Sequence, residues 1–322
     1  MKKALIIHNR ISENALLDEL DVLEEADVVE KEFKKLGYEV YREDFDLNMQ
    51  RVKESIQKLK PDFIFNLVET VDGKGFLSFM APALFESLGI PFSGSGSFPL
   101  YLTSHKMLAK EAFVAAGIPT GEWYSANETE KLNPTKRYIV KPYGEDASVG
   151  ISEDAVFYGN DPKLKEYIDN NKSAGFFIEE YIHGREFNIS VLGGKKGPRV
   201  MPPAEMKYHE YPDDKPFVLG YKAKWDEDSF EYQNTRRTFD FPETDKPLLE
   251  KVRQISLDCW NKFNLHGYVR VDIRVDKDNN PYVLEINANP CISPDAGFYV
   301  ACNQGGVEFS EVISEIIYDG QR

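Results

Sequence analysis

The sequence predicts a protein of mixed α/β and α+β class, in which a parallel sheet covered by helices precedes two strand-rich units. Three observations support this prediction. Short apolar strands alternate with segments of helix length as far as about residue 103, as in parallel sheets covered by helices. Short strands and loops then replace the leucine-rich helices. The length of 322 residues, with 42% hydrophobic side chains, is sufficient for two or three cores.

The first 103 residues contain three strands and three helices in alternation. Residues 3–7 form the first strand. Apolar residues at mixed three- and four-residue spacing predict a helix from about Glu19 to Leu36, and Gly37 is expected to end it. The elements that follow are a strand at 38–44, a helix ending near Lys60, a strand at 62–68 and a helix at about 76–88.

The elements after residue 103 predict two further domains. The first has a helix at 104–117, after a glycine- and serine-rich stretch, and strands at 136–142 and 176–182. The second has strands at 186–192 and 199–206, a polar irregular segment at 207–238, a helix near 246–263 and two final strands. The predicted domains are therefore 1–103, 104–185 and 186–322.

Composition excludes several classes of function. A formal net charge of −15 disfavours a nucleic-acid partner, because binding to phosphate backbones requires clustered lysine and arginine. No apolar run reaches the roughly 18–20 residues of a membrane span, and the apolar run near the start is too short for a secretory signal. Three cysteines without CxxC spacing disfavour a disulfide framework and a zinc site. A cytoplasmic protein is expected.

The last two strands carry a polar face. Arg270 and Asp272 alternate with apolar residues in YVRVDIRVD, and Glu285 and Asn287 share one face of YVLEINANP. If the strands form a hairpin that turns at residues 278–279, Asp272 faces Glu285 and Arg270 faces Asn287. Facing carboxylates repel unless a cation or proton lies between them, and oxygen-only ligands suit Mg²⁺ or Mn²⁺. The alternative is a solvated ribbon with Arg–Asp pairs.

Two other segments favour a nucleotide site. Lys141 ends a strand in IVKPYGEDASVGIS and precedes a glycine-containing loop with Ser148, which could fold over phosphates. The spacing differs from the GxxxxGK[ST] loop, so a P-loop enzyme is not expected. In FFIEEYIHGREF, the backbone near Glu179 and Glu180 could contact an adenine edge, and Glu186 could accept ribose hydroxyls. A surface turn and solvated acidic residues are the alternatives.

Together these segments resemble the ATP-grasp ligases, and specifically the D-alanine–D-alanine ligase branch. The resemblance covers most of the chain, is strongest from about 100 to 300, and rests on LTSHKMLAK, IVKPYGEDASVGIS, FFIEEYIHGREF, GYKAKW, GYVRVDIRVD and YVLEINANP in this order. It implies the ATP-grasp fold with an N-terminal Rossmann-like domain. It also implies that a substrate carboxylate attacks the γ-phosphorus of ATP, and that an amine then displaces phosphate from the acylphosphate. A homodimer is a family expectation.

The resemblance implies roles for particular residues. The nucleotide phosphates would be contacted by Lys106 and Lys141, under a loop that carries Ser148 and Val149. Lys224 would reach the γ-phosphate from segment 207–238. The adenine would be bordered by Glu179, Glu180 and Ile182, and the ribose would be held by Glu186. Two Mg²⁺ ions would be bound by Asp272, Glu285 and Asn287, and Arg270 would steady the tetrahedral intermediate.

The substrate side departs from the family pattern. The family's glycine-rich turn after the first strand is missing, and Glu13 is a displaced counterpart of the Glu that helps hold the ammonium group in the family. A second family turn is replaced by NLVETVDGKG, in which Glu69 and Asp72 are expected to face the cleft. Ala296 stands where the family has a Ser that helps hold the acceptor's carboxylate, with Asp295 beside it. This pattern predicts a cationic or carboxylate-free acceptor amine, unless Asp295 caps the following helix.

The sequence thus predicts an ATP- and Mg²⁺-dependent ligase that joins a small-molecule carboxylate to an amine. One alternative is an ATP-grasp ligase that modifies a peptide or protein terminus. Another, of a different class, is a module that senses ATP without catalysis. Cys291 has no evident activating histidine, so a structural role is expected for it.

Overall fold

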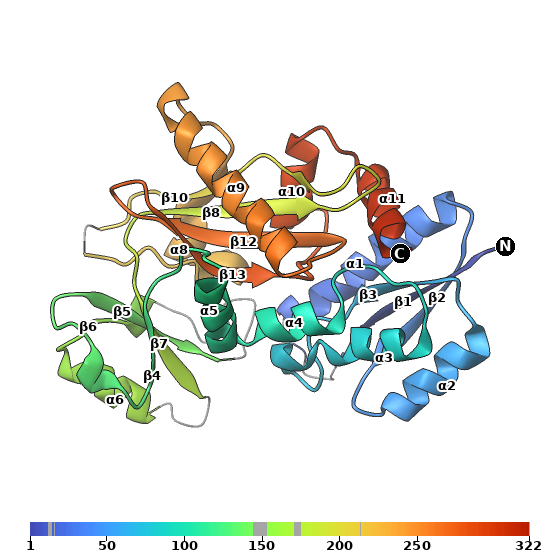
Figure 1. Ribbon diagram of the computed structural model, residues 1–322, viewed down its shortest axis with the longest axis horizontal. Coiled ribbons are helices and arrows are strands. Elements are labelled where there is room, and N and C mark those ends of the chain that lie inside the picture. Colours follow the sequence, from blue (N-terminus) through green and yellow to red (C-terminus); the bar gives the residue numbers. More distant parts are fainter. Residues whose placement is uncertain (12–14, 16, 144–152, 171–174, 213, 322) are drawn as a thin grey trace.

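The computed structural model describes residues 1–322 except 12–14, 16, 144–152, 171–174, 213 and 322. The mixed class predicted from the sequence is confirmed. One sheet is parallel and the other two are antiparallel, and Figure 1 shows them side by side with helices on their outer faces. Within the part of the chain that is described, none of the helices combines the length and apolar content needed to cross a membrane.

The amino-terminal sheet has the strand order β2-β1-β3, all parallel. Its strands are β1 (Lys3–Asn9), β2 (Glu39–Phe45) and β3 (Phe63–Leu67). Its helical elements are α1 (Leu17–Lys35), α2 (Met49–Leu59), η1 (Gly75–Leu77) and α3 (Met80–Leu88). After α1 the chain turns at Gly37, whose φ of 81° is a left-handed conformation that glycine adopts readily.

The next sheet is antiparallel, with the order β4-β7-β5-β6. Its strands are β4 (Trp123–Ser125), β5 (Arg137–Pro142), β6 (Val156–Tyr158) and β7 (Phe176–Glu180), and α6 (Pro162–Asn170) packs beside it. The short 3₁₀ turns η2 (Thr129–Lys131) and η3 (Glu153–Ala155) connect these elements. Two helices precede the sheet, α4 (Ser97–Ser104) and α5 (Lys106–Ala115).

The largest sheet is built on the path β11-β10-β8-β12-β13, with β9 paired to β8. Its strands are β8 (Arg185–Leu192), β9 (Arg199–Val200), β10 (Ala204–Tyr208), β11 (Thr235–Thr238), β12 (Tyr268–Val275) and β13 (Pro281–Asn287). After the turn η5 (Glu243–Asp245), helix α9 (Lys246–Lys262) covers β8 and β12, as Figure 1 shows.

Several elements differ from the sequence prediction. The segment 207–238, expected to be irregular, contains α7 (Tyr221–Trp225), α8 (Phe230–Asn234) and β11. The sequence analysis also missed α4, α6 and α11 (Phe309–Gly320), and it considered α10 (Gly297–Gln304) only as the helix that Asp295 would cap. Helices α4, α6 and α10 have only eight or nine residues, so apolar periodicity extends over few turns in them. Helix α11 has 12 residues and buries apolar residues at helical spacing, so its pattern was an available signal that the analysis overlooked.

The carboxy-terminal helices complete the core of the amino-terminal sheet. Ile313 and Ile316 of α11 belong to the same buried cluster as Ile6 of β1 and Phe65 of β3. Figure 1 shows α11 beside α1 at the edge of the first sheet. Residues from the two ends of the chain therefore share one hydrophobic core, and this packing holds the loop after β13 close to α1.

Candidate active site

The polar hairpin forms with the predicted register. Strands β12 and β13 pair so that Asp272 faces Glu285 and Arg270 faces Asn287. The register shifts by one residue after Asp272, which marks a β-bulge at this point. Arg270 binds the Asp272 carboxylate with two hydrogen bonds, from Nε at 2.8 Å and from Nη2 at 2.9 Å. The Asn188 amide of β8 donates a third bond at 2.8 Å, so the carboxylate is held firmly in place.

Cations from three other elements surround Glu285. The Lys106 ammonium at the start of α5 lies 3.6 Å from its carboxylate, and Lys141 and Lys224 also act on it electrostatically. Burial alone would raise the pKa of Glu285, but these lysines and Arg270 lower it to about 2. Its side chain is about one third exposed, so it faces the adjoining cavity as an anion.

Glu179 is buried between two lysines and does not reach solvent. The Lys141 ammonium lies 2.6 Å from one carboxylate oxygen, and Lys110 of α5 bonds the other. Lys110 also donates to the Thr120 hydroxyl at 2.8 Å and to the Val283 carbonyl of β13 at 3.1 Å. Sequence reasoning missed Lys110, although it lies one helical turn after Lys106 on the same helix and this spacing was an available signal.

A partly open cavity lies between the antiparallel sheets. The sequence-predicted residues on its wall are Lys141, Glu179, Glu180, Ile182, Glu186, Lys224, Asp272 and Glu285. Apolar side chains complete the lining, among them Ile139, Val218, Leu219 and Leu284. A pocket that combines an apolar wall with a few converging charges is the usual form of a small-molecule site.

Glu186 is fixed by groups that the sequence analysis did not identify. Arg274 of β12 forms an ion pair with its carboxylate at 2.7 Å, and the Tyr208 hydroxyl donates to the same oxygen at 2.8 Å. Burial and the Glu186 charge raise the pKa of Tyr208 well above its usual value, so the phenol keeps its proton. The alternation of Arg270, Asp272 and Arg274 along β12 was the available signal for this pair.

Lys224 lies on α7 and lines the cavity. Burial lowers the pKa of its ammonium, and the nearby Arg270 lowers it further. Three sequence-predicted residues, Glu13, Ser148 and Val149, lie outside the described residues. Asp72 lies in an exposed turn, where Lys74 pairs with it at 3.2 Å.

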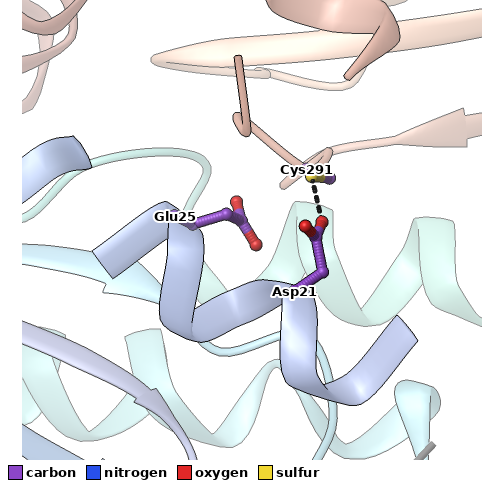
Figure 2. Close-up of side chains that lie close together, drawn as sticks. All are labelled: Asp21, Glu25 and Cys291. Atoms are coloured by element: carbon purple, nitrogen blue, oxygen red, sulfur yellow. Dashed lines mark hydrogen bonds between the residues drawn. The ribbon is translucent and has the colours of Figure 1, made fainter. Parts of the chain in front are cut away.

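A second acidic cluster lies between α1 and the loop after β13. Figure 2 shows Asp21 and Glu25 of α1 turned toward Cys291, and one ligand atom from each lies within 4.8 Å of the others. The Cys291 thiol donates to Asp21 at 2.9 Å, and the backbone N–H of Ile292 donates to Glu25 at 2.8 Å. Glu69 adds a further negative charge nearby. The four-residue spacing of Asp21 and Glu25 on one helix face was the sequence signal for this cluster.

The alternative role considered for Asp295, as the cap of the following helix, is wrong. Helix α10 begins at Gly297, and its N-cap residue is Ala296, which makes no side-chain cap hydrogen bond. The Asp295 side chain is exposed and acts electrostatically on Arg237 of β11, a residue that the sequence analysis also missed.

The described site residues can hold an anionic molecule. Lysines from three elements and Arg270 converge near two facing carboxylates, an arrangement that neutralises transferring phosphoryl charge. Cys291 is a poor nucleophile, because burial and the nearby Glu25 raise the pKa of its thiol well above the usual range.

Known proteins share this architecture. A family model described as D-ala D-ala ligase C-terminus matches residues 113–318. The D-alanine–D-alanine ligase of Aquifex aeolicus (strain VF5) is 26% identical over 325 residues, which cover 98% of this chain and 100% of that protein. The crystal structure of the D-alanine–D-alanine ligase from Bacillus anthracis has a TM-score of 0.76 at 23% identity and covers 100% of this chain and 98% of that one. Its complex with ATP gives 0.76 at 22% identity, over the same shares of the two chains.

Proposed function

This chain belongs to the D-alanine–D-alanine ligase family of ATP-grasp proteins, and from this premise we propose that it is an ADP-forming ligase that joins a carboxylate to an amine. The observation that carries the proposal is the group of cations around Glu285, next to a second carboxylate, Asp272, on the facing strand. The proposed substrates are small molecules that differ from the plain D-alanine pair.

The cavity between the antiparallel sheets is the proposed ATP site. Lys141 and Lys106 are positioned to neutralise phosphate charge at one end, where Lys224 approaches from α7. At the other end, Ile182 and the apolar lining would contact the base, and Glu186 would accept the ribose hydroxyls. The ATP complex of the Bacillus anthracis relative supports a nucleotide in this fold.

The residues of the hairpin fit a divalent cation. Asp272, Glu285 and Asn287 offer only oxygen ligands, and the low pKa of Glu285 keeps its carboxylate ionised at neutral pH. The Asn287 amide nitrogen lies 3.2 Å from Asp272, so turning the amide over would bring its oxygen to the same place. A bound Mg²⁺ or Mn²⁺ would supply charge neutralisation to the phosphoryl group.

The remaining chemistry is positioning and charge stabilisation by side chains. The substrate carboxylate would attack the γ-phosphorus, the bond to the β-phosphate oxygen would break, and ADP would leave with those electrons. The amine would then attack the acylphosphate carbon, and the Arg270 guanidinium would stabilise the developing oxyanion. The carbon–oxygen bond to phosphate would then break, phosphate would leave with those electrons, and the nitrogen would release a proton to the departing phosphate or to water as the amide forms. No step requires a covalent enzyme intermediate, in agreement with the high thiol pKa of Cys291.

Two other functions stand as alternatives. A ligase that modifies a peptide or protein terminus would use the same ATP site with a macromolecular substrate. A module that senses ATP would bind the nucleotide without turnover. The cations around Glu285 favour catalysis over sensing. They gather beside the ionised carboxylate, where the charge of a transferring phosphoryl group would be neutralised, and not at the apolar end of the cavity.

The test is a screen of ADP release with carboxylates and amines in pairs, including amino acids, dipeptides and diamines. We expect at least one pair to release ADP in an amine-dependent way, and Asp272→Asn to abolish that release through loss of a metal ligand. Asp258→Asn, on the outer helix α9, is the matched control and should keep full activity. ATP binding without release in any pair would identify a sensor, and activity in Asp272→Asn would refute the metal assignment.

A further inference from the structure

Glu186 of β8 and Arg274 of β12 face each other directly across the largest sheet. The Arg274 Nη2 atom lies 2.7 Å from Glu186 Oε2, and each residue is only 5% exposed. Two residues along the same ladder, Asn188 faces Asp272 and donates to its carboxylate at 2.8 Å. The paired strands therefore carry two cavity carboxylates about 7 Å apart, and each is bound by the residue that faces it.

The Arg274 guanidinium is fixed by further acceptors. It donates from Nη1 to the Gly184 carbonyl at 3.1 Å and from Nη2 to the Phe217 carbonyl. The Phe217 N–H donates to the Tyr181 hydroxyl at 2.7 Å, so Phe217 is itself held in place. A planar guanidinium with several fixed acceptors has little freedom to rotate. Arg274 therefore presents its charge to Glu186 in one orientation.

The two carboxylate oxygens of Glu186 have different surroundings. Oε2 receives both the Arg274 guanidinium and a hydrogen bond of 2.8 Å from the Tyr208 hydroxyl. An ionised carboxylate oxygen offers about two acceptor positions, so these donors use Oε2 fully. Within the part of the chain that is described, no hydrogen bond engages Oε1, and Glu186 lines the cavity. One oxygen is thus occupied, and the other is available to a ligand.

The place of this ion pair favours ligand recognition over stability alone. A buried ion pair contributes little net stability, because desolvation of both groups offsets their attraction. Arg274 and Glu186 both lie on the wall of the cavity, where a ligand can use the remaining acceptor. The bond from Arg274 to Phe217 also ties down the segment that continues into Val218 and Leu219, two further lining residues.

We propose that Arg274 is a positioning residue that makes nucleotide binding depend on the ribose hydroxyls. This inference rests on the proposed function, in which ATP occupies the cavity. Arg274 balances the charge of Glu186 and holds Oε2, so that Oε1 is directed to the cavity. The 2′- or 3′-hydroxyl of ATP would donate to this oxygen. A hydrogen bond to an ionised acceptor held in one orientation is stronger than a bond to a neutral or mobile one.

The experiment measures the Kd of ATP, 2′-deoxy-ATP and 3′-deoxy-ATP by titration calorimetry with Mg²⁺, without a donor or an acceptor. The wild type should bind at least one deoxynucleotide about 10- to 100-fold more weakly than ATP, the loss expected for a hydrogen bond to a charged group. In Arg274→Met most of this ratio should be lost, because Glu186 is no longer oriented. Arg274→Lys should recover part of the ratio.

A second variant and a control accompany this measurement. Tyr208→Phe removes a donor to Oε2 but keeps both charges and the ring that stacks on Phe217, so it should lower the ratio less than Arg274→Met does. Arg199→Met, on β9 of the same sheet, breaks only an exposed pair with Glu311 at 3.1 Å. This control should keep the wild-type ratio.

Equal binding of the three nucleotides by the wild type would overturn the inference. An Arg274→Met variant that binds all three more weakly in the same proportion would assign Arg274 a structural role. If Arg274→Met does not fold, an unchanged ratio in Tyr208→Phe would have the same meaning. The titration requires no turnover, so a chain that shows the ratio but releases no ADP would refute the ligase activity alone. If none of the nucleotides binds, both proposals fail.

Discussion

Lys110 and Glu179 form an ion pair in which each side chain is only 1% exposed. Lys110 lies on α5 and Glu179 on β7, and Lys110 also bonds the backbone carbonyl of Val283 on β13. A single ammonium therefore connects a helix to both antiparallel sheets at the wall of the candidate ATP cavity. The pair also orients Glu179 toward Lys141, which in turn places the Lys141 ammonium beside the cavity.

Removing this ammonium should destabilise the protein strongly. Lys110→Met leaves the buried Glu179 with one cation instead of two, and breaking a buried pair costs about 3–5 kcal/mol. Urea denaturation followed by tryptophan fluorescence measures the loss, and Lys110→Met/Glu179→Gln should lose less than the sum of the single variants. Lys34→Met, which breaks an exposed pair with Glu30, should change stability little. Strict additivity of the two buried substitutions would contradict the prediction.

The stability of the protein should depend on the ionisation of Glu25. This residue is 2% exposed, and burial, with Glu69 and Asp21 nearby, raises its pKa well above the usual value near 4.5. Above about pH 4.5 the Glu25 carboxyl loses its proton in the unfolded chain but keeps it in the folded protein. Stability should therefore fall as pH rises from about 4.5 to the folded-state pKa.

Denaturation between pH 5 and 8 tests this expectation. Glu25→Gln removes the ionisation but keeps an oxygen that can accept the hydrogen bond from Ile292, so its stability should decline less with pH than that of the wild type. Glu24→Gln, at the neighbouring exposed position, should follow the wild-type slope. A Glu25→Gln variant with the full wild-type slope would show that Glu25 is not the titrating group.

Gly267 should be intolerant of any side chain. Its φ is 69°, and a Cβ atom would lie 2.7 Å from both the N and the Cα atoms of Gly94, where the two backbones cross. Gly267→Ala should cost about 2–5 kcal/mol, because backbone strain adds to overpacking. Gly37→Ala is the matched control: its φ of 81° brings strain of about 1–2 kcal/mol, but nothing lies within 4 Å. Equal thermal shifts for the two variants would exclude the crossing as the cause.

Cys291 should be dispensable for turnover. Burial raises its thiol pKa, with further contributions from Glu25 and Glu69, so little thiolate forms at neutral pH. Cys291→Ser keeps a donor for Asp21 and should retain most of the ADP release of the wild type. Iodoacetamide should react slowly at pH 7. A loss of activity in Cys291→Ser without loss of stability would indicate a chemical role for the thiol.

The sequence was most informative where the pattern is local. The two-residue alternation in β12 and β13 was sufficient to predict that Asp272 faces Glu285 and Arg270 faces Asn287, because a hairpin turn fixes its own register. The same pattern could not reveal the bulge after Asp272, which depends on the packing of both strands against their neighbours.

The amino-acid sequence by itself determined the mixed fold class, the order of the main strands and the facing pairs of the polar hairpin, because each follows from periodicity over a few residues. Only the tertiary structure decided which distant groups meet. Lys110 reaches Glu179 across 69 residues, because α5 shares a hydrophobic core with β13. Cys291 reaches Asp21 across 270 residues, because α11 completes the amino-terminal core. Burial then shifts the pKa of the ionisable groups, and the burial of a side chain depends on how the whole molecule packs rather than on any one segment of the chain.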